Sequence, residues 1–196
     1  NGPSLTAAQL TVLHNTASTA FASNRIWKIY PQTPWRPDAV FMMDFMRAQH
    51  QACRDDLIEH LKLGYPVYMR ADFTRHMEHE LTARAILVPD CEHRGAGSTD
   101  RWFLPYLCKV YGSLSVAMQF AVREGYKTLI LIGADGQYNA QEINNHFIDG
   151  YLPVEVQRTP EQARSDTANL LAGHDIAARE CRAAGVTVLN ATGPNS

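Results

Sequence analysis

Short β-rich runs alternate with longer stretches of helical character along this chain, and this alternation constrains the fold more than any other feature. Strands separated by helices form a mainly parallel sheet with helices on both faces, which is the α/β class. A length of 196 residues predicts a single domain with a large core. We expect strands at residues 18–22, 39–43, 67–69, 85–88, 128–132 and 186–189.

Three helices are expected between these strands. Residues 45–63 and 114–124 carry apolar side chains at helical spacing, and each stretch is followed by a glycine that is typical of a helix end. The run 127–132 then predicts a strand buried on both faces. A third helix is expected over 160–184, with Gly173 as a candidate break.

The charge balance and the cysteine spacing argue against several classes of protein and site. A net charge of −2 leaves no basic footprint, so a nucleic-acid partner is not expected. The four cysteines lack the spacing of a zinc site or a disulfide framework, which favours a reducing, cytoplasmic location. No apolar run could span a membrane. Peripheral membrane association and a homo-oligomer stay open. We expect residues 90–109 to form a loop or a lid.

The chain opens on a motif suited to phosphate. Asn1, Gly2, Pro3 and Ser4 form a turn that leads into a helix, where exposed backbone N–H groups can bind an anion. Capping of that helix by Ser4 or Thr6 is an equally weighted alternative. A phosphate-binding turn normally follows a strand, and none precedes Asn1, so we expect a trimmed chain or a missing first strand.

Polar side chains follow three of the expected strands. Asn24 and Arg25 come after the first, Asp44 after the second, and Asp135 after the run 127–132. The carboxyl ends of parallel strands form the ligand crevice of open α/β sheets, where Asn24 could bind a base or ribose. The alternatives are a turn with a solvated arginine and a helix cap by Asp44.

A Gly-Ser step and one histidine complete the candidate site. Gly112 lets a ligand approach the backbone, and Ser113 can donate to a phosphate at the start of the second helix, with helix capping as the alternative. His146 lies in a polar loop beyond the strand 128–132 and could act as a general base, with His174 as its rival. Solvated surface positions are expected for His50, His60, His76 and His79.

These motifs together resemble a known superfamily. The resemblance rests on the ordered segments NGPSL, SNRI, PDAVFMMD, GS, GYKTLILIGAD, NHF and GVTVLNAT. The superfamily is Rossmann-like and includes bacterial sialyltransferases, motility-accessory-factor glycosyltransferases, and 6-hydroxymethylpterin pyrophosphokinase-like proteins.

The resemblance implies a transferase and assigns its site. A nucleotide-activated sugar, CMP-linked and sialic-acid-like, would be the donor, and a glycan or glycolipid hydroxyl the acceptor. Asn1 to Ser4, Asn24 and Ser113 would line the nucleotide site, Gly112 would approach the phosphate, and His146 would be the base. The reaction would invert the anomeric carbon without a metal or a bound cofactor.

Two alternatives stay open. The first is a Mg²⁺-dependent pterin pyrophosphokinase, with the metal held by Asp44 and Asp135. The second is a non-catalytic nucleotide-binding module. Asp55 and Asp56 are adjacent on an expected helix and should point in different directions, so they are not expected to hold a metal together.

Overall fold

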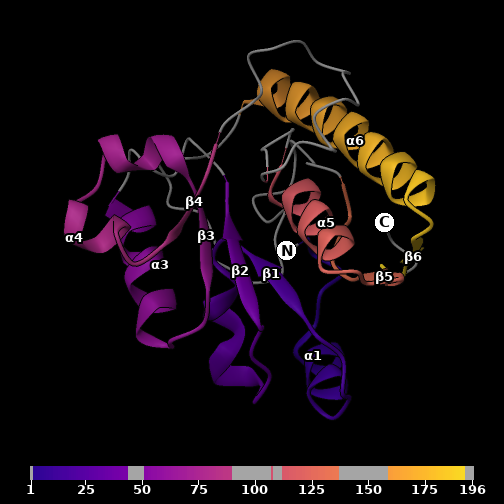
Figure 1. Ribbon diagram of the computed structural model, residues 1–196, viewed down its shortest axis with the longest axis horizontal. Coiled ribbons are helices and arrows are strands. Elements are labelled where there is room, and N and C mark those ends of the chain that lie inside the picture. Colours follow the sequence, from indigo (N-terminus) through magenta and orange to yellow (C-terminus); the bar gives the residue numbers. More distant parts are fainter. Residues whose placement is uncertain (1, 44–50, 90–106, 108–111, 137–158, 193–196) are drawn as a thin grey trace.

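The computed structural model describes residues 2–43, 51–89, 107, 112–136 and 159–192. Helices and strands alternate along this part of the chain (Figure 1). In chain order the elements are α1 (Ala7–His14), β1 (Phe21–Ser23), η1 (Ile26–Gln32), β2 (Ala39–Met42), α3 (Gln51–Lys62), β3 (Val67–Arg70), η2 (Ala71–Arg75), α4 (His79–Thr82), β4 (Ile86–Val88), α5 (Ser113–Arg123), β5 (Thr128–Leu131), α6 (Pro160–Ala183) and β6 (Thr187–Asn190).

All six expected strands are present, and every described strand pair is parallel. Four of them form one sheet in the order β1-β2-β3-β4, and β5 pairs with β6. The α/β class with a parallel sheet is therefore confirmed. Within the described residues, backbone hydrogen bonds join the strands into these two groups rather than into one continuous sheet.

Strand β2 is the centre of the core, because all four of its residues are buried. Val40 and Met42 pack in the cluster that includes residues of α1, η1 and α3. Phe41 points to the other face and packs in a second cluster with Val116 of α5. The period of two along a strand sends successive side chains to opposite faces. Helices therefore cover this sheet on both faces, with α3 and α5 on opposite sides of it in Figure 1.

Helix α6 runs without a break from Pro160 to Ala183, so the expected interruption at Gly173 is wrong. Gly173 is buried together with Ala177 and Cys181 on one side of the helix. Gly173 therefore lies on the packed side of the helix, and its poor helix propensity, about 1 kcal/mol relative to alanine, does not interrupt α6. Ala177 and Cys181 pack with Met118 of α5 in a third core cluster.

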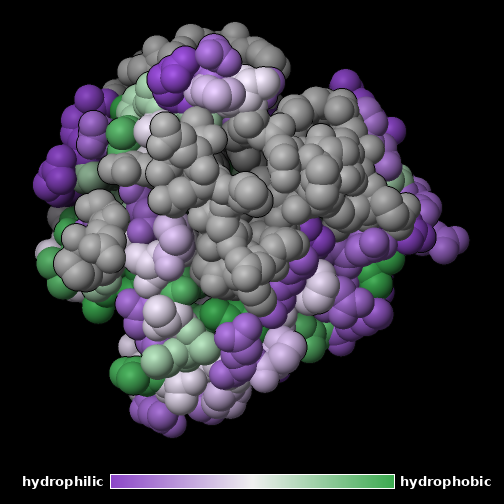
Figure 2. Space-filling model, turned by 180° about the vertical axis from the view of Figure 1, so that it is seen from behind, coloured by the Kyte–Doolittle hydropathy of each residue, from purple (hydrophilic) through white to green (hydrophobic). Residues whose placement is uncertain are grey.

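Strand β5 is not buried on both faces, contrary to the prediction from its continuous apolar run. Leu129 and Leu131 pack against the cluster formed by α5 and α6, whereas Ile130 on the other face is 62% exposed. Its partner across the pair is Leu189, which is also exposed. Seen from the side opposite to Figure 1, the described surface has hydrophobic residues scattered among hydrophilic ones (Figure 2).

Several predictions lie outside the described residues. These are the first part of the helix expected at 45–63 and most of the loop or lid expected at 90–109. No helix in the described ranges combines the length and the apolar character needed to cross a membrane.

Gly133, just after β5, is predicted to be intolerant of substitution. Its φ is +61°, and an added Cβ would lie 2.7 Å from Leu5 Cβ. Gly133→Ala should lower the free energy of unfolding by about 2–4 kcal/mol, because overpacking adds to the backbone cost of about 1 kcal/mol. Urea denaturation measures this.

Gly185→Ala is the matched control. Gly185 has a similar φ of +71°, and nothing lies within 4 Å of an added Cβ. It should show only the backbone cost, and equal losses in the two variants would contradict the close packing at Gly133.

Candidate functional site

The opening turn of the chain packs against the segment that follows β5. The Gly2 N–H donates to the Gly133 carbonyl over 2.8 Å, and the Ser4 N–H donates to Asp135 Oδ2 over 3.4 Å. A Cβ on Gly2 would lie only 1.6 Å from Asp135 Oδ2, so only glycine allows this approach. Two motifs more than a hundred residues apart in sequence are thus brought into direct contact.

The hydroxyl of Ser4 has no hydrogen-bond partner among the described residues, although its Oγ is buried. Thr6, not Ser4, caps helix α1: its side chain accepts from the Gln9 N–H, and the Gln9 side chain accepts from the Thr6 N–H. A buried hydroxyl without a partner costs free energy unless a ligand or water satisfies it. Ser4 Oγ therefore keeps unused hydrogen-bonding capacity inside the described part of the structure.

The Gly-Ser step begins helix α5 beside the end of β2. Gly112 is the N-cap residue, and its backbone is extended. Ser113 Oγ accepts from the Met43 N–H over 3.3 Å, and the hydroxyl still has its own proton to donate. Ser113 is thus tied to the carboxyl end of β2, and the sequence predicts that its hydroxyl donates to a phosphate at the start of this helix.

One stretch of α6 lies against both the Gly-Ser step and the segment that follows β5. An added Cβ on Gly112 would lie 3.4 Å from Leu170, and one on Gly136 would lie 3.0 Å from Leu171 and 3.5 Å from His174 Nδ1. The Gly-Ser step and the segment after β5 therefore lie against the same turns of one helix. Burial lowers the pKa of His174, while Asp175 opposes the shift. The imidazole is neutral at pH 7 and can accept a proton.

Three of the predicted site residues lie outside the described part of the chain: Asn1, Asp44 and His146.

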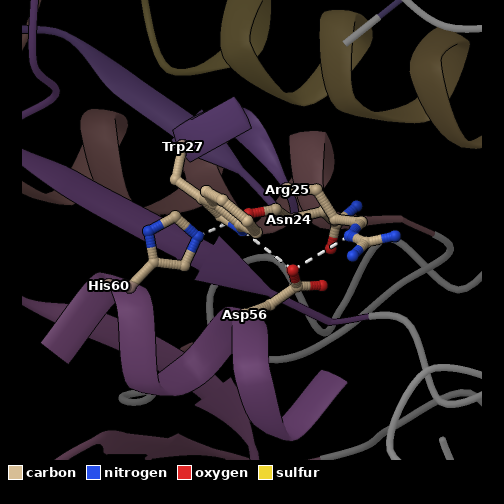
Figure 3. Close-up of polar contacts among 5 residues, drawn as sticks. All are labelled: Asn24, Arg25, Trp27, Asp56 and His60. Carbon is tan, nitrogen blue, oxygen red and sulfur yellow. Dashed lines mark hydrogen bonds and ion pairs between the residues drawn. The ribbon is translucent and has the colours of Figure 1, made fainter. Parts of the chain in front are cut away.

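Asn24 follows β1 and has a left-handed backbone, with φ of +51°. Its N–H donates to the Phe41 carbonyl over 3.2 Å. Arg25 is buried and paired with Asp56, so the alternative of a turn with a solvated arginine is wrong. Figure 3 shows Asn24 and Arg25 in the turn above helix α3, which carries Asp56.

The surface position expected for His60 is also wrong, because His60 is fully buried. His76 and His79 are exposed as predicted, and Asp55 is exposed whereas Asp56 is buried. The sequence does contain a sign that Asp56 and His60 are buried. They stand four residues apart on one helix, next to Leu57 and Leu61, which are also buried.

A further ion pair, at the carboxyl end of β3, was not predicted from the sequence. Arg70 is the last residue of β3, and its guanidinium donates from Nε and Nη2 to the two carboxylate oxygens of Asp72. Arg70 is 6% exposed. A bidentate pair of this kind fixes both side chains at the carboxyl end of the strand.

Comparisons with protein-family models, with curated proteins and with solved structures gave no match to this chain.

Stability should fall on acidification because of two histidines. Burial lowers the native pKa of His60 and His174 from 6.5. The unfolded chain then binds protons that the native state does not, so the stabilisation present above pH 6.5 is lost as pH falls. Each histidine contributes a slope of at most about 1.4 kcal/mol per pH unit.

Urea denaturation of the wild type and His60→Gln between pH 7.5 and 5.0 measures this dependence. The variant should show a shallower loss, by the share of one histidine. An unchanged slope would contradict a neutral, buried His60.

Proposed function

We propose that this chain is a Rossmann-like glycosyltransferase that uses a nucleotide-activated sugar, CMP-linked and sialic-acid-like, and transfers it to a hydroxyl of a glycan or glycolipid. The observation that supports this most is the contact between the opening turn and Asp135: the Ser4 N–H donates to the carboxylate, and the buried Ser4 hydroxyl has no partner among the described residues. The sequence resemblance supplies the donor and acceptor classes.

Three groups would bind the phosphate of the donor. The N-terminus of α5 begins at Ser113 and presents backbone N–H groups and a positive dipole end. The Ser113 and Ser4 hydroxyls can each donate to a phosphate oxygen. This arrangement would stabilise the charge that develops on the leaving nucleotide.

The chemistry is a single displacement with inversion. The acceptor oxygen attacks the anomeric carbon, the bond from that carbon to the phosphate oxygen breaks, and the nucleotide leaves with the electron pair. A histidine takes the acceptor proton, a contribution of typically about 10²- to 10⁴-fold. We assign this role to His146 from the sequence. His174 is the alternative: its Nδ1 would lie 3.5 Å from a Cβ added to Gly136, in the segment after β5.

Thermal-shift measurements with CMP, CDP, UDP, GDP and ATP, with and without Mg²⁺, test the donor class. CMP should raise the melting temperature without metal, because a ligand that binds only the native state stabilises it. Stabilisation by ATP only with Mg²⁺ would favour a pyrophosphokinase instead. Ser4→Ala should weaken CMP binding by about 10-fold, the value of one hydrogen bond to a charged group.

The melting temperature of ligand-free Ser4→Ala should stay close to that of the wild type. Thr16→Ala is the control, since Thr16 is an exposed hydroxyl on another part of the chain that donates to Leu13. Equal CMP affinity in Ser4→Ala and the wild type would remove Ser4 from the site.

Turnover in two histidine variants identifies the base. His146→Ala should lower kcat by at least about 100-fold while donor affinity stays near normal. If His174→Ala alone shows that loss, the base is His174. Full activity in both variants would contradict a histidine base. Activity that persists in EDTA would support transfer without a metal.

A further inference from the structure

The turn after β1 is held from below by two side chains of helix α3 (Figure 3). Asp56 Oδ1 accepts from Arg25 Nε over 2.9 Å and from Trp27 Nε1 over 2.8 Å. His60 Nε2 lies 2.6 Å from the Asn24 carbonyl oxygen. Asp56 is 1% exposed and His60 is fully buried. Two adjacent turns of one helix thus bind two residues of this turn, Asn24 and Arg25, and Trp27 at the start of η1.

The hydrogen bonds of His60 have a defined direction. The Asn24 carbonyl can only accept, so His60 carries its proton on Nε2. Nδ1, without a proton in the neutral ring, accepts from the Tyr65 hydroxyl over 2.8 Å. The Tyr65 oxygen in turn accepts from the Tyr30 hydroxyl over 2.9 Å. A chain of three donors therefore ends on the Asn24 backbone.

This chain ends on a strained residue. Asn24 is the one non-glycine residue with positive φ in the described part of the structure. Such a conformation persists where the surroundings hold it, and it is frequently found at functional sites. The Asn24 side chain is only half-buried, at the carboxyl end of β1. A buried ion pair and a buried histidine are thus both directed at one strained turn.

We propose that Asp56 and His60 are positioning residues that hold the Asn24 turn in its left-handed form and thereby set the affinity for the donor nucleotide. This role rests on the proposed function. Neither side chain touches the donor: they act through the backbone of Asn24 and the guanidinium of Arg25.

Two amide variants of His60 separate its contacts. Gln places its amide nitrogen close to the position of Nε2 and can still donate to the Asn24 carbonyl, whereas Asn places its amide close to Nδ1 and faces Tyr65. Both bury a polar amide, so both should lose stability to a similar extent. Asp56 is a poorer choice for the test, because its removal takes a carboxylate away from the buried guanidinium of Arg25.

The affinity for CMP, measured by calorimetry, should stay within about 3-fold of the wild type in His60→Gln and fall by about 10-fold in His60→Asn. Tyr30→Phe is the control, since it removes the far end of the chain and leaves the bond to Asn24. Its affinity should change by less than about 2-fold. Hydrogen exchange of peptides covering residues 21–32, measured without ligand, should rise in His60→Asn and not in His60→Gln.

Each result bears on one claim. Wild-type affinity in His60→Asn, together with faster exchange, would overturn the role of His60 in donor binding and leave the proposed function intact. Unchanged exchange in His60→Asn would overturn the positioning itself. A wild-type protein that binds no nucleotide would overturn the proposed function and, with it, this role.

Discussion

The structure depends on β2, a strand that is buried on both faces and sends its side chains in two directions. Val40 and Met42 anchor one layer of helices and Phe41 anchors the other. Because β2 lies inside the four-stranded sheet, its carboxyl end meets the ends of β1 and β3 at one edge. Met43, just beyond β2, then supplies the N–H that fixes Ser113 at the start of α5. Core packing and the placement of the candidate site are consequences of the same strand.

The strands were predictable because each is a short apolar run between helical segments, and that pattern is local. Burial was less predictable. The continuous run in β5 resembles a strand buried on both faces, but a side chain such as Ile130 is covered only if another element packs on it. The sequence does not state which face the helices will cover. The break predicted at Gly173 is wrong for a similar reason, because the packing around α6 decides whether a glycine interrupts the helix.

The polar contacts of the candidate site were predictable only where strand order decides them. Parallel strands bring their carboxyl ends together, and this rule alone suggests that Asp135 and Asn24 lie at an edge of a sheet. It could not show that Gly2 lies against Asp135, because that contact joins segments at opposite ends of the chain. His60 and Arg25 are charged or titratable types that are usually exposed. The spacing of His60 beside Leu57 and Leu61 is a local sign of its burial, but both residues are bonded to partners in distant segments, and no local pattern encodes those partners.

Helix α6 touches Gly112 and Gly136 through neighbouring residues of the same turns. When a helix that packs against two segments tilts or slides, its contacts with both segments change. A bulkier side chain at Leu170 would therefore press on the start of α5, and one at Leu171 on the segment after β5. Because Leu170 and Leu171 are neighbours on one helix, the distance between the start of α5 and the segment after β5 depends on where α6 lies.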